Sequence, residues 1–278
     1  MKKTWFITGS ARGLGRAMVE HVLSNGDNVV ATARNTERLA DLVTQYGQQI
    51  YPVSLDVTDV DAVNTAVKAA LDHFGTIDVL VNNAGFADMD SVEEMPLTTF
   101  KAQMDTDFYG TLYTIKAILP AMRSARSGRI INISSIGGRI GGAGLSAYQS
   151  AKFAVNGLSE VLSHEVKPFG IQVTTVEPGG MRTEWGGDSM DATKGGIYQE
   201  TVGQAIRMIH DQWHEAGDRY VSEPAKVAAA IDTLSNMAEA PVHLLIGKDA
   251  EQAAQLHATA LAQSDEKNRQ LTESTGNM

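Results

Sequence analysis

Tyr148 and Lys152 stand four positions apart in the segment AYQSAKFAV, residues 147–155. Side chains at this spacing lie on one face of an α-helix, so a helix here would bring the phenol and the ammonium together. An ammonium a few ångströms away favours the phenolate and lowers the pKa of a tyrosine from its usual value of about 10. We therefore predict a tyrosine that exchanges a proton with an alcohol or carbonyl oxygen.

Ser135 stands thirteen residues before Tyr148, directly after the apolar run RIINIS at 129–134. Ligands of open α/β sheets bind beyond the carboxyl ends of the strands, and Ser135 is expected at such an end. Its hydroxyl can then hold the same substrate oxygen as the phenol. Taken singly, a Tyr/Lys pair is usually surface packing and an S-S dipeptide is usually a strand end. The assignment therefore depends on the elements that position these residues.

Short β-rich runs alternate with helical periods along most of the chain. Apolar strands spaced by helices predict a doubly wound α/β fold, a parallel Rossmann-type sheet of about seven strands covered on both faces. Residues 1–278 are expected to form one domain. Strands are expected at 4–8, 28–32, 50–53, 78–85, 129–134, 171–176 and 242–246, and helices at 13–25, 36–46, 59–74, 99–125 and 146–167.

The segment TGSARGLG, residues 8–15, follows the first expected strand and opens the first helix. Gly9, Gly13 and Gly15 allow a tight turn and let a pyrophosphate approach the backbone. The helix N-terminus supplies free N–H groups and the positive end of a dipole. The chain has no G-x-x-x-x-G-K-[ST] motif, which argues against an NTPase. This turn therefore predicts a dinucleotide site.

The end of the second strand should meet the adenosine ribose of a bound dinucleotide. An NAD site places an acid there, about twenty residues after the glycines. This chain instead has Ala33 followed by Arg34, and a cation suits a 2′-phosphate. Arg12, inside the glycine turn, can clamp the same phosphate. We predict NADP(H), preferred over NAD(H); the alternative is that both arginines are ordinary solvated side chains.

Composition narrows the function classes further. The net charge of −10, from 23 basic and 33 acidic residues, repels nucleic acid and anionic membranes, so neither is an expected partner. The chain has no cysteine, which excludes a thiol nucleophile and Cys-ligated zinc, and no metal site is predicted. The apolar stretch near the N-terminus is too short for a signal peptide, and no run is long enough to span a membrane. The cytoplasm is the expected location.

Four motifs, in this order, resemble the short-chain dehydrogenase/reductase family: TGSARGLG, NNAG at 82–85, the Ser135–Tyr148–Lys152 spacing and EPGGMRT at 177–183. The resemblance is strong over about residues 4–185, and within the family it is most similar to hydroxysteroid and retinol dehydrogenases. It implies an oxidoreductase that interconverts a small-molecule carbonyl compound and a secondary alcohol. It also implies a homodimer or homotetramer, packed through the helices at 99–125 and 146–167.

The resemblance assigns roles to individual residues. Tyr148 would be the acid/base, Lys152 would lower its pKa and bind the nicotinamide ribose, and Ser135 would polarise the carbonyl. Asp56 would bind the adenine edge, Asn83 would lie beside the adenosine, and residues 178–183 would hold the nicotinamide carboxamide. The cofactor residues implied are Gly9, Ser10, Arg12, Gly13, Leu14, Gly15, Arg34, Asp56, Val57, Asn83, Ala84, Gly85, Tyr148, Lys152, Pro178, Gly179 and Thr183.

One position departs from the family pattern. The family has an asparagine in an N-x-x-G pattern that supports a water relay to the lysine, whereas this chain has Asp107 before Gly110. An ionised aspartate only accepts hydrogen bonds, and it would keep Lys152 charged. We assign Asp107 to the catalytic group with an altered role. The alternative is a catalytically impaired NADP(H)-binding sensor or regulatory protein. A sugar-nucleotide epimerase is disfavoured, because Arg12 takes the place of the middle glycine of its G-x-x-G-x-x-G turn.

The segment 180–220 interrupts the strand–helix alternation and is flanked by glycines. Long segments of this kind in compact domains are often functional, so we expect a substrate lid. Trp185, Met190 and Met208 would contact an apolar substrate. The alternative is ordinary hydrophobic packing under a long loop. The last dozen residues are polar, and we expect them to be frayed.

Overall fold

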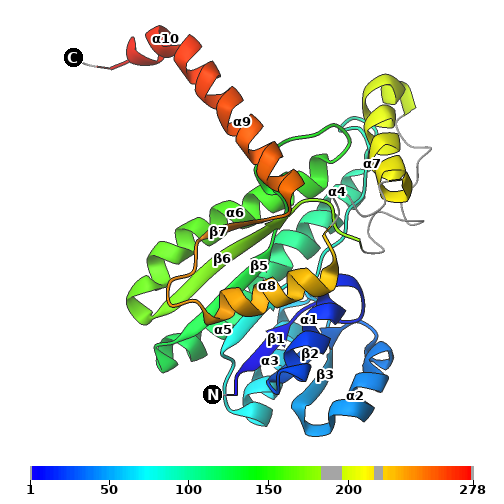
Figure 1. Cartoon of the computed structure of the whole chain (residues 1–278), viewed down its shortest axis with the longest axis vertical. Coiled ribbons are helices and arrows are strands. Elements are labelled where there is room, and N and C mark those ends of the chain that lie inside the picture. The colour runs from blue at the N-terminus through cyan, green and yellow to red at the C-terminus, as the bar shows by residue number, and fades with distance from the viewer. Residues whose placement is uncertain (1, 183–195, 216–221, 277–278) are drawn as a thin grey trace.

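The computed structural model describes residues 2–182, 196–215 and 222–276. Its strands form one sheet in the order β3-β2-β1-β4-β5-β6-β7, and every pairing is parallel (Figure 1). This confirms the predicted doubly wound α/β fold. The strands are β1 (Thr4–Ile7), β2 (Asn28–Ala33), β3 (Ile50–Ser54), β4 (Val79–Asn82), β5 (Gly128–Ile133), β6 (Ile171–Pro178) and β7 (His243–Ile246).

Helices cover both faces of the sheet. They are α1 (Gly13–Ser24), α2 (Ala40–Tyr46), α3 (Val60–Phe74), α4 (Leu97–Met104), α5 (Gly110–Ala125), α6 (Ser146–Val166), α7 (Gln204–Glu215), α8 (Pro224–Asn236), α9 (Lys248–Lys267) and α10 (Arg269–Glu273). Side chains of α1, α2 and α8 form one buried cluster with Trp5 and Ile7, and those of α3, α5 and α6 form another with Phe6. The split follows from strand geometry, because successive side chains of β1 point to opposite faces.

The strand order reverses next to β1, which pairs with β2 on one side and with β4 on the other. The chain after β1 and the chain after β4 therefore leave the same edge of the sheet as neighbours. The backbone N–H of Thr8 donates to the carbonyl oxygen of Val81 at 3.0 Å across this boundary. In open α/β sheets, ligands bind in the crevice at such a switch point.

The single helix expected at 99–125 is wrong in one respect. α4 ends at Met104, the segment Asp105–Tyr109 forms a π-helical turn, and α5 follows without a break. A π-helical turn holds an additional residue, and single turns of this kind often occur at functional sites. Here the turn carries Asp107, whose side chain is buried. The apolar periodicity does not reveal the turn, because one wide turn barely disturbs the pattern on either side.

Beyond β6, the described residues include the α-helices α7, α8, α9 and α10, which we did not predict. Pro224 occupies the first position of α8, where its fixed φ favours helix formation, so this start signal was overlooked. In α9 the buried residue is Ala250, and the rest of the helix extends away from the sheet (Figure 1). The last dozen residues, expected to be frayed, include α10. Within the described ranges, no helix has the length and apolar character needed to cross a membrane.

Candidate active site

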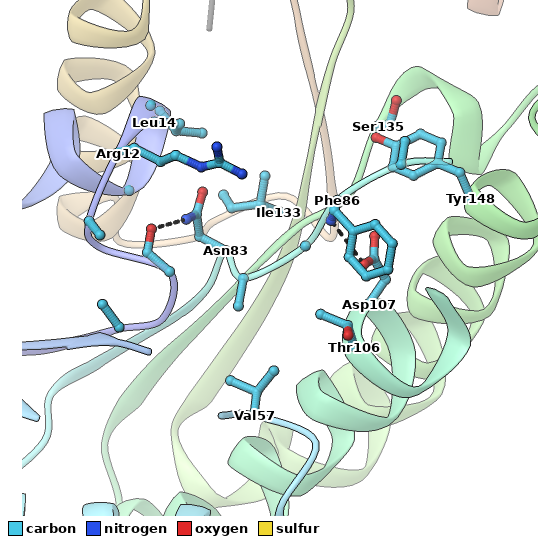
Figure 2. Close-up of a pocket in the computed structure, with 18 of the residues that line it drawn as sticks. Arg12, Leu14, Val57, Asn83, Phe86, Thr106, Asp107, Ile133, Ser135 and Tyr148 are labelled. Atoms are coloured by element: carbon cyan, nitrogen blue, oxygen red, sulfur yellow. Dashed lines mark hydrogen bonds between the residues drawn. The ribbon is translucent and has the colours of Figure 1, made fainter. Parts of the chain in front are cut away.

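A cleft of about 1000 Å³ opens at the carboxyl edge of the sheet, where the strand order reverses. Figure 2 shows Arg12 and Leu14 at one end and Ser135 and Tyr148 at the other, with Asn83 between them. The volume lies at the upper end of the range for small-molecule and cofactor sites, which is about 300–1000 Å³. The cleft therefore brings the predicted nucleotide turn and the predicted catalytic residues into one site.

The glycine turn after β1 leaves space for a ligand beside its backbone. Gly9 has a φ of +66°, a conformation that favours glycine. A Cβ on Gly15 would lie 2.1 Å from the carbonyl oxygen of Gly9, so a side chain cannot be placed there. The N-cap residue of α1, Arg12, makes no capping hydrogen bond with its side chain, and the first turn has no acidic residue. This helix N-terminus therefore suits an anionic group such as a pyrophosphate.

Asn83 holds the glycine turn against the end of β4. Its Nδ2 donates to the carbonyl oxygens of Thr8 at 3.0 Å and Gly9 at 3.2 Å. Its backbone N–H donates to Oγ1 of Thr8 at 2.9 Å. The amide of Asn83 is thus engaged with the protein itself, and the side chain fixes the floor of the cleft.

The nucleotide end of the cleft is lined by cations and by one acid. Arg34 follows β2 directly and is exposed, and Arg38, in the 3-10 turn Thr36–Leu39, lines the same cleft. Asp56 accepts hydrogen bonds from the backbone N–H and the hydroxyl of Thr58, at 3.0 and 2.8 Å. The Thr58 backbone hydrogen bond holds the pKa of Asp56 below its usual value, and the charge of Arg34 adds to this. Sequence reasoning missed Arg38, although its spacing of four from Arg34 was a usable signal.

At the other end, Tyr148 and Lys152 project from α6 toward Ser135. The Ser135 hydroxyl lies close enough to the Tyr148 phenol to work toward a lower pKa of that phenol. Nζ of Lys152 lies 5.5 Å from the centroid of the Tyr148 ring and donates to the carbonyl oxygen of Ile133 at 3.0 Å. The helical spacing thus produces the expected cluster of phenol, ammonium and hydroxyl. Ile133 was missed, because a backbone acceptor leaves no signal in residue type.

The electrostatics of this cluster differ from the expectation. Burial raises the pKa of the Tyr148 phenol, and the opposing effects of Lys152 and Ser135 do not offset it, while Asp107 raises it further. The predicted net lowering of the Tyr148 pKa is therefore wrong. Burial also works to lower the pKa of Lys152, but the charges of Asp107 and Tyr148 outweigh it and leave that pKa raised. The i, i+4 spacing predicts the attraction between Tyr148 and Lys152. It does not reveal that both side chains are buried or that Asp107 adds a third charge.

Asp107 lies beneath the loop that follows β4. Its Oδ2 is 3.3 Å from Nζ of Lys152, and its Oδ1 accepts the backbone N–H of Phe86 at 3.2 Å (Figure 2). Burial raises the pKa of the Asp107 carboxyl, and the charge of Lys152 opposes that rise. A Cβ on Gly85 would approach the carboxylate to 3.1 Å. The carboxylate is thus buried, ion-paired with Lys152 and hydrogen-bonded to the loop that follows β4.

Apart from Ser10 and Thr183, every residue that the sequence assigned to the site lines this cleft. Ser10 is buried, and its hydroxyl donates to the carbonyl oxygen of Ile7 at 2.8 Å, so it shapes the turn from within. Thr183 lies outside the described residues, as do Trp185 and Met190 of the expected lid. The structure adds lining residues that sequence reasoning did not name, among them Phe86, Ala87, Asp88, Thr106 and Met181.

The described half of the lid segment packs beside the catalytic end. Val202 and Ile206 form a small buried cluster with Met89, which belongs to the loop after β4. Leu145, which immediately precedes α6, packs against the same cluster. Met208 is on α7 and is 62% exposed, and it is not among the residues that line the cleft.

Comparison with known proteins identifies the short-chain dehydrogenase family over most of the chain. Residues 3–194 match the family model described as short chain dehydrogenase. The chain is 47% identical over 274 residues to Oxidoreductase BOA17 from Botryotinia fuckeliana, and the match covers 98% of each chain. It is similar to a solved short-chain dehydrogenase from Streptomyces avermitilis, with a TM-score of 0.89, 34% identity and 100% of both chains covered. It is also similar to ElxO, solved with NADP bound, with a TM-score of 0.73, 30% identity, and 88% of this chain and 96% of ElxO covered. The chain is therefore an oxidoreductase of the short-chain dehydrogenase/reductase family.

Proposed function

We propose that this chain catalyses reversible hydride transfer between NADP(H) and a carbonyl compound or the corresponding secondary alcohol. The observation that carries the proposal is the cluster of Tyr148, Ser135 and Lys152 at one end of a cleft whose other end is a glycine turn. The bound nicotinamide would supply or accept the hydride. The protein supplies a fixed position for the substrate oxygen and a proton at that oxygen.

The chain's own residues account for the proton transfer. In reduction, the hydroxyls of Ser135 and Tyr148 hold the carbonyl oxygen, and the phenol gives its proton to that oxygen. Lys152, held by the Ile133 carbonyl oxygen at 3.0 Å, stays charged and stabilises the phenolate that remains. Because burial raises the pKa of the phenol, Tyr148 stays protonated in the free protein and is ready to act as an acid.

The preference for NADP(H) over NAD(H) is supported by the charges at the nucleotide end. Arg12, Arg34 and Arg38 line this end, and the position after β2 has no acid to accept the 2′-hydroxyl of NAD. Guanidinium groups pair with phosphate through two parallel hydrogen bonds, which suits a 2′-phosphate. The similar protein ElxO was solved with NADP bound, which supports the same assignment.

The substrate is proposed to be a small and largely apolar molecule, held under a lid formed by residues 180–220. The cluster of Met89, Val202 and Ile206 supports this, because it fixes the start of α7 beside the catalytic end of the cleft. The motif resemblance to hydroxysteroid and retinol dehydrogenases, which is a prediction from the sequence, is the second argument for this class of substrate.

We also propose that the chain works as a homodimer or homotetramer packed through residues 99–125, which include most of α4, the π-helical turn and α5, and through residues 146–167, which include α6. These elements present exposed apolar side chains to solvent: Tyr109 (41% exposed), Phe153 (46%) and Val161 (57%). Exposed apolar side chains gathered on neighbouring helices are typical of an interface.

A second candidate is an NADP(H)-binding sensor or regulatory protein without turnover. It is favoured by the buried ion pair of Asp107 with Lys152, at 3.3 Å, where the family has a neutral asparagine. Such a pair reduces the influence of the ammonium on Tyr148, because the two charges largely cancel at the phenol.

The experiment that separates the two candidates measures binding and turnover on the same preparation. NADPH binding is followed by fluorescence, and NADPH consumption is followed with a panel of ketones, aldehydes, steroids and acyl-linked oxo compounds. Consumption with at least one carbonyl class supports the reductase. Tight NADPH binding with no consumption across the panel contradicts it and supports the sensor.

A further inference from the structure

Residues 178–182 follow the end of β6, and the first four of them line the cleft beside the catalytic end. Elements much later in the chain hold this segment in place. The backbone N–H of Gly179 donates to the carbonyl oxygen of Ile246 at 2.9 Å, at the end of β7. Gly180 and Arg182 exchange backbone hydrogen bonds with Ser222, at 2.8 and 3.0 Å. The position of this part of the cleft is therefore set by the C-terminal region.

One further contact to this segment comes from a side chain. Oδ2 of Asp249, in the first turn of α9, accepts the backbone N–H of Gly180 at 2.7 Å. A hydrogen bond to an ionised acceptor is stronger than one between neutral groups, and its loss is correspondingly costly. Asp249 thus joins the start of α9 directly to the cleft wall.

The carboxylate of Asp249 fits closely between two glycines. A Cβ on Gly179 would lie 2.0 Å from its Oδ2, and a Cβ on Gly247 would lie 2.5 Å from its Oδ1. Both distances are far shorter than a normal non-bonded contact. The carboxylate therefore occupies the space that side chains at positions 179 and 247 would need. Its Oδ1 is buried and has no hydrogen-bond partner among the described residues. A buried unpaired acceptor destabilises the fold, so stability alone does not explain a carboxylate here.

We propose that Asp249 is a positioning residue, which fixes residues 178–182 and thereby sets the affinity of the site for the nicotinamide half of its dinucleotide. The inference rests on the proposed function for the identity of the ligand. Asp249 acts through Gly180 and does not touch the reacting atoms. The adenosine half is held at the glycine turn, at the far end of the cleft, and does not depend on Asp249.

The alternative role for Asp249 is local. An acid in the first turn of a helix stabilises that helix through its dipole, and Asp249 is placed for this. Glu251 is also acidic, occupies the same turn and is exposed, so it provides a matched control. If the acid only stabilised the helix, replacing Asp249 or Glu251 would have similar effects. Neither replacement would then affect the nicotinamide half of the ligand more than the adenosine half.

The test compares two ligands by calorimetry on the full chain: NADP⁺, and 2′-phospho-ADP-ribose, which lacks the nicotinamide. We expect Asp249→Ala to weaken NADP⁺ by about tenfold, the effect of losing one hydrogen bond to a charged group. The affinity for 2′-phospho-ADP-ribose should stay within about twofold of wild type, and Glu251→Ala should change neither. Asp249→Asn keeps an acceptor oxygen, and it should restore most of the NADP⁺ affinity.

The remaining outcomes each contradict the inference. Equal weakening of both ligands, or no weakening of NADP⁺ by Asp249→Ala, overturns the positioning role while leaving the proposed function intact. The same selective loss in Glu251→Ala overturns it as well, because the effect would then belong to the helix. A wild-type chain that binds neither ligand overturns the proposed function and this inference together. Should the alanine variant fail to fold, by circular dichroism, the asparagine variant carries the test. Its neutral oxygen accepts a weaker hydrogen bond, so a loss of about two- to threefold for NADP⁺ alone supports the role, and unchanged affinity or equal weakening of both ligands overturns it.

Discussion

Arg34→Ala tests whether the nucleotide end of the cleft recognises a 2′-phosphate. Arg34 follows β2, lines the cleft and is exposed, and its charge lowers the pKa of Asp56 across the same edge. In NADPH the guanidinium would meet the 2′-phosphate, whereas in NADH it would meet a neutral hydroxyl. Removing it should therefore weaken NADPH and leave NADH almost unchanged.

The size of the effect follows from the exposure of Arg34. A hydrogen bond to a charged group contributes about 1.5–3 kcal/mol, and solvent screening places an exposed arginine at the lower end of this range. A loss of about 1.5 kcal/mol corresponds to about a tenfold higher Kd for NADPH. The difference should shrink as ionic strength rises, because exposed charges are screened within about 10 Å at 0.1 M salt.

The assay is a fluorescence titration of NADPH and NADH into wild type and variant at two salt concentrations. Arg269→Ala, in α10 and exposed far from the cleft, controls for the general loss of one positive charge. An equal loss of affinity for both cofactors in Arg34→Ala would refute the phosphate assignment. So would a loss that the Arg269→Ala control reproduces.

Two further substitutions test the catalytic end and the glycine turn. Asp107 raises the pKa of both the phenol and the ammonium, so Asp107→Asn should move the alkaline limb of the reductive pH–rate profile to lower pH. The exposed neighbour variant Asp105→Asn should leave the limb in place, and coincident profiles for Asp107→Asn and wild type would contradict the reasoning. Gly15→Ala places a Cβ 2.1 Å from a backbone oxygen of its own turn, so it should destabilise the fold by about 1–3 kcal/mol and weaken NADPH. Gly141→Ala, where a Cβ meets no described atom within 4 Å, should not lower the melting temperature, and an equal loss of stability in both glycine variants would rule out the steric explanation.

Local features of the site could be predicted from the sequence because their geometry depends on nearby residues. The glycine turn needs only a strand, three glycines and a helix start in succession. The face shared by Tyr148 and Lys152 needs only one helix, and α6 supplies it from Ser146 to Val166. The parallel sheet followed from strands that are apolar on both faces.

Properties that depend on distant elements could not be predicted. The raised pKa of Tyr148 comes from burial and from the charge of Asp107, which lies in the π-helical turn Asp105–Tyr109. The contact of Asp249 with Gly180 joins residues 69 positions apart, and no local pattern indicates it. Pro224, by contrast, was a local signal for α8 that was open to use.

Tyr148→Phe tests the central claim most directly, because it removes the hydroxyl and leaves the ring beside Lys152. The matched control is Tyr113→Phe. Tyr113 lies on α5, is partly buried and does not line the cleft. We expect the Tyr148 variant to bind NADPH as wild type does and to reduce carbonyl substrate about 100- to 10,000-fold more slowly, while Tyr113→Phe keeps normal turnover. Normal turnover by Tyr148→Phe, with NADPH bound, would show that this phenol is not the proton donor.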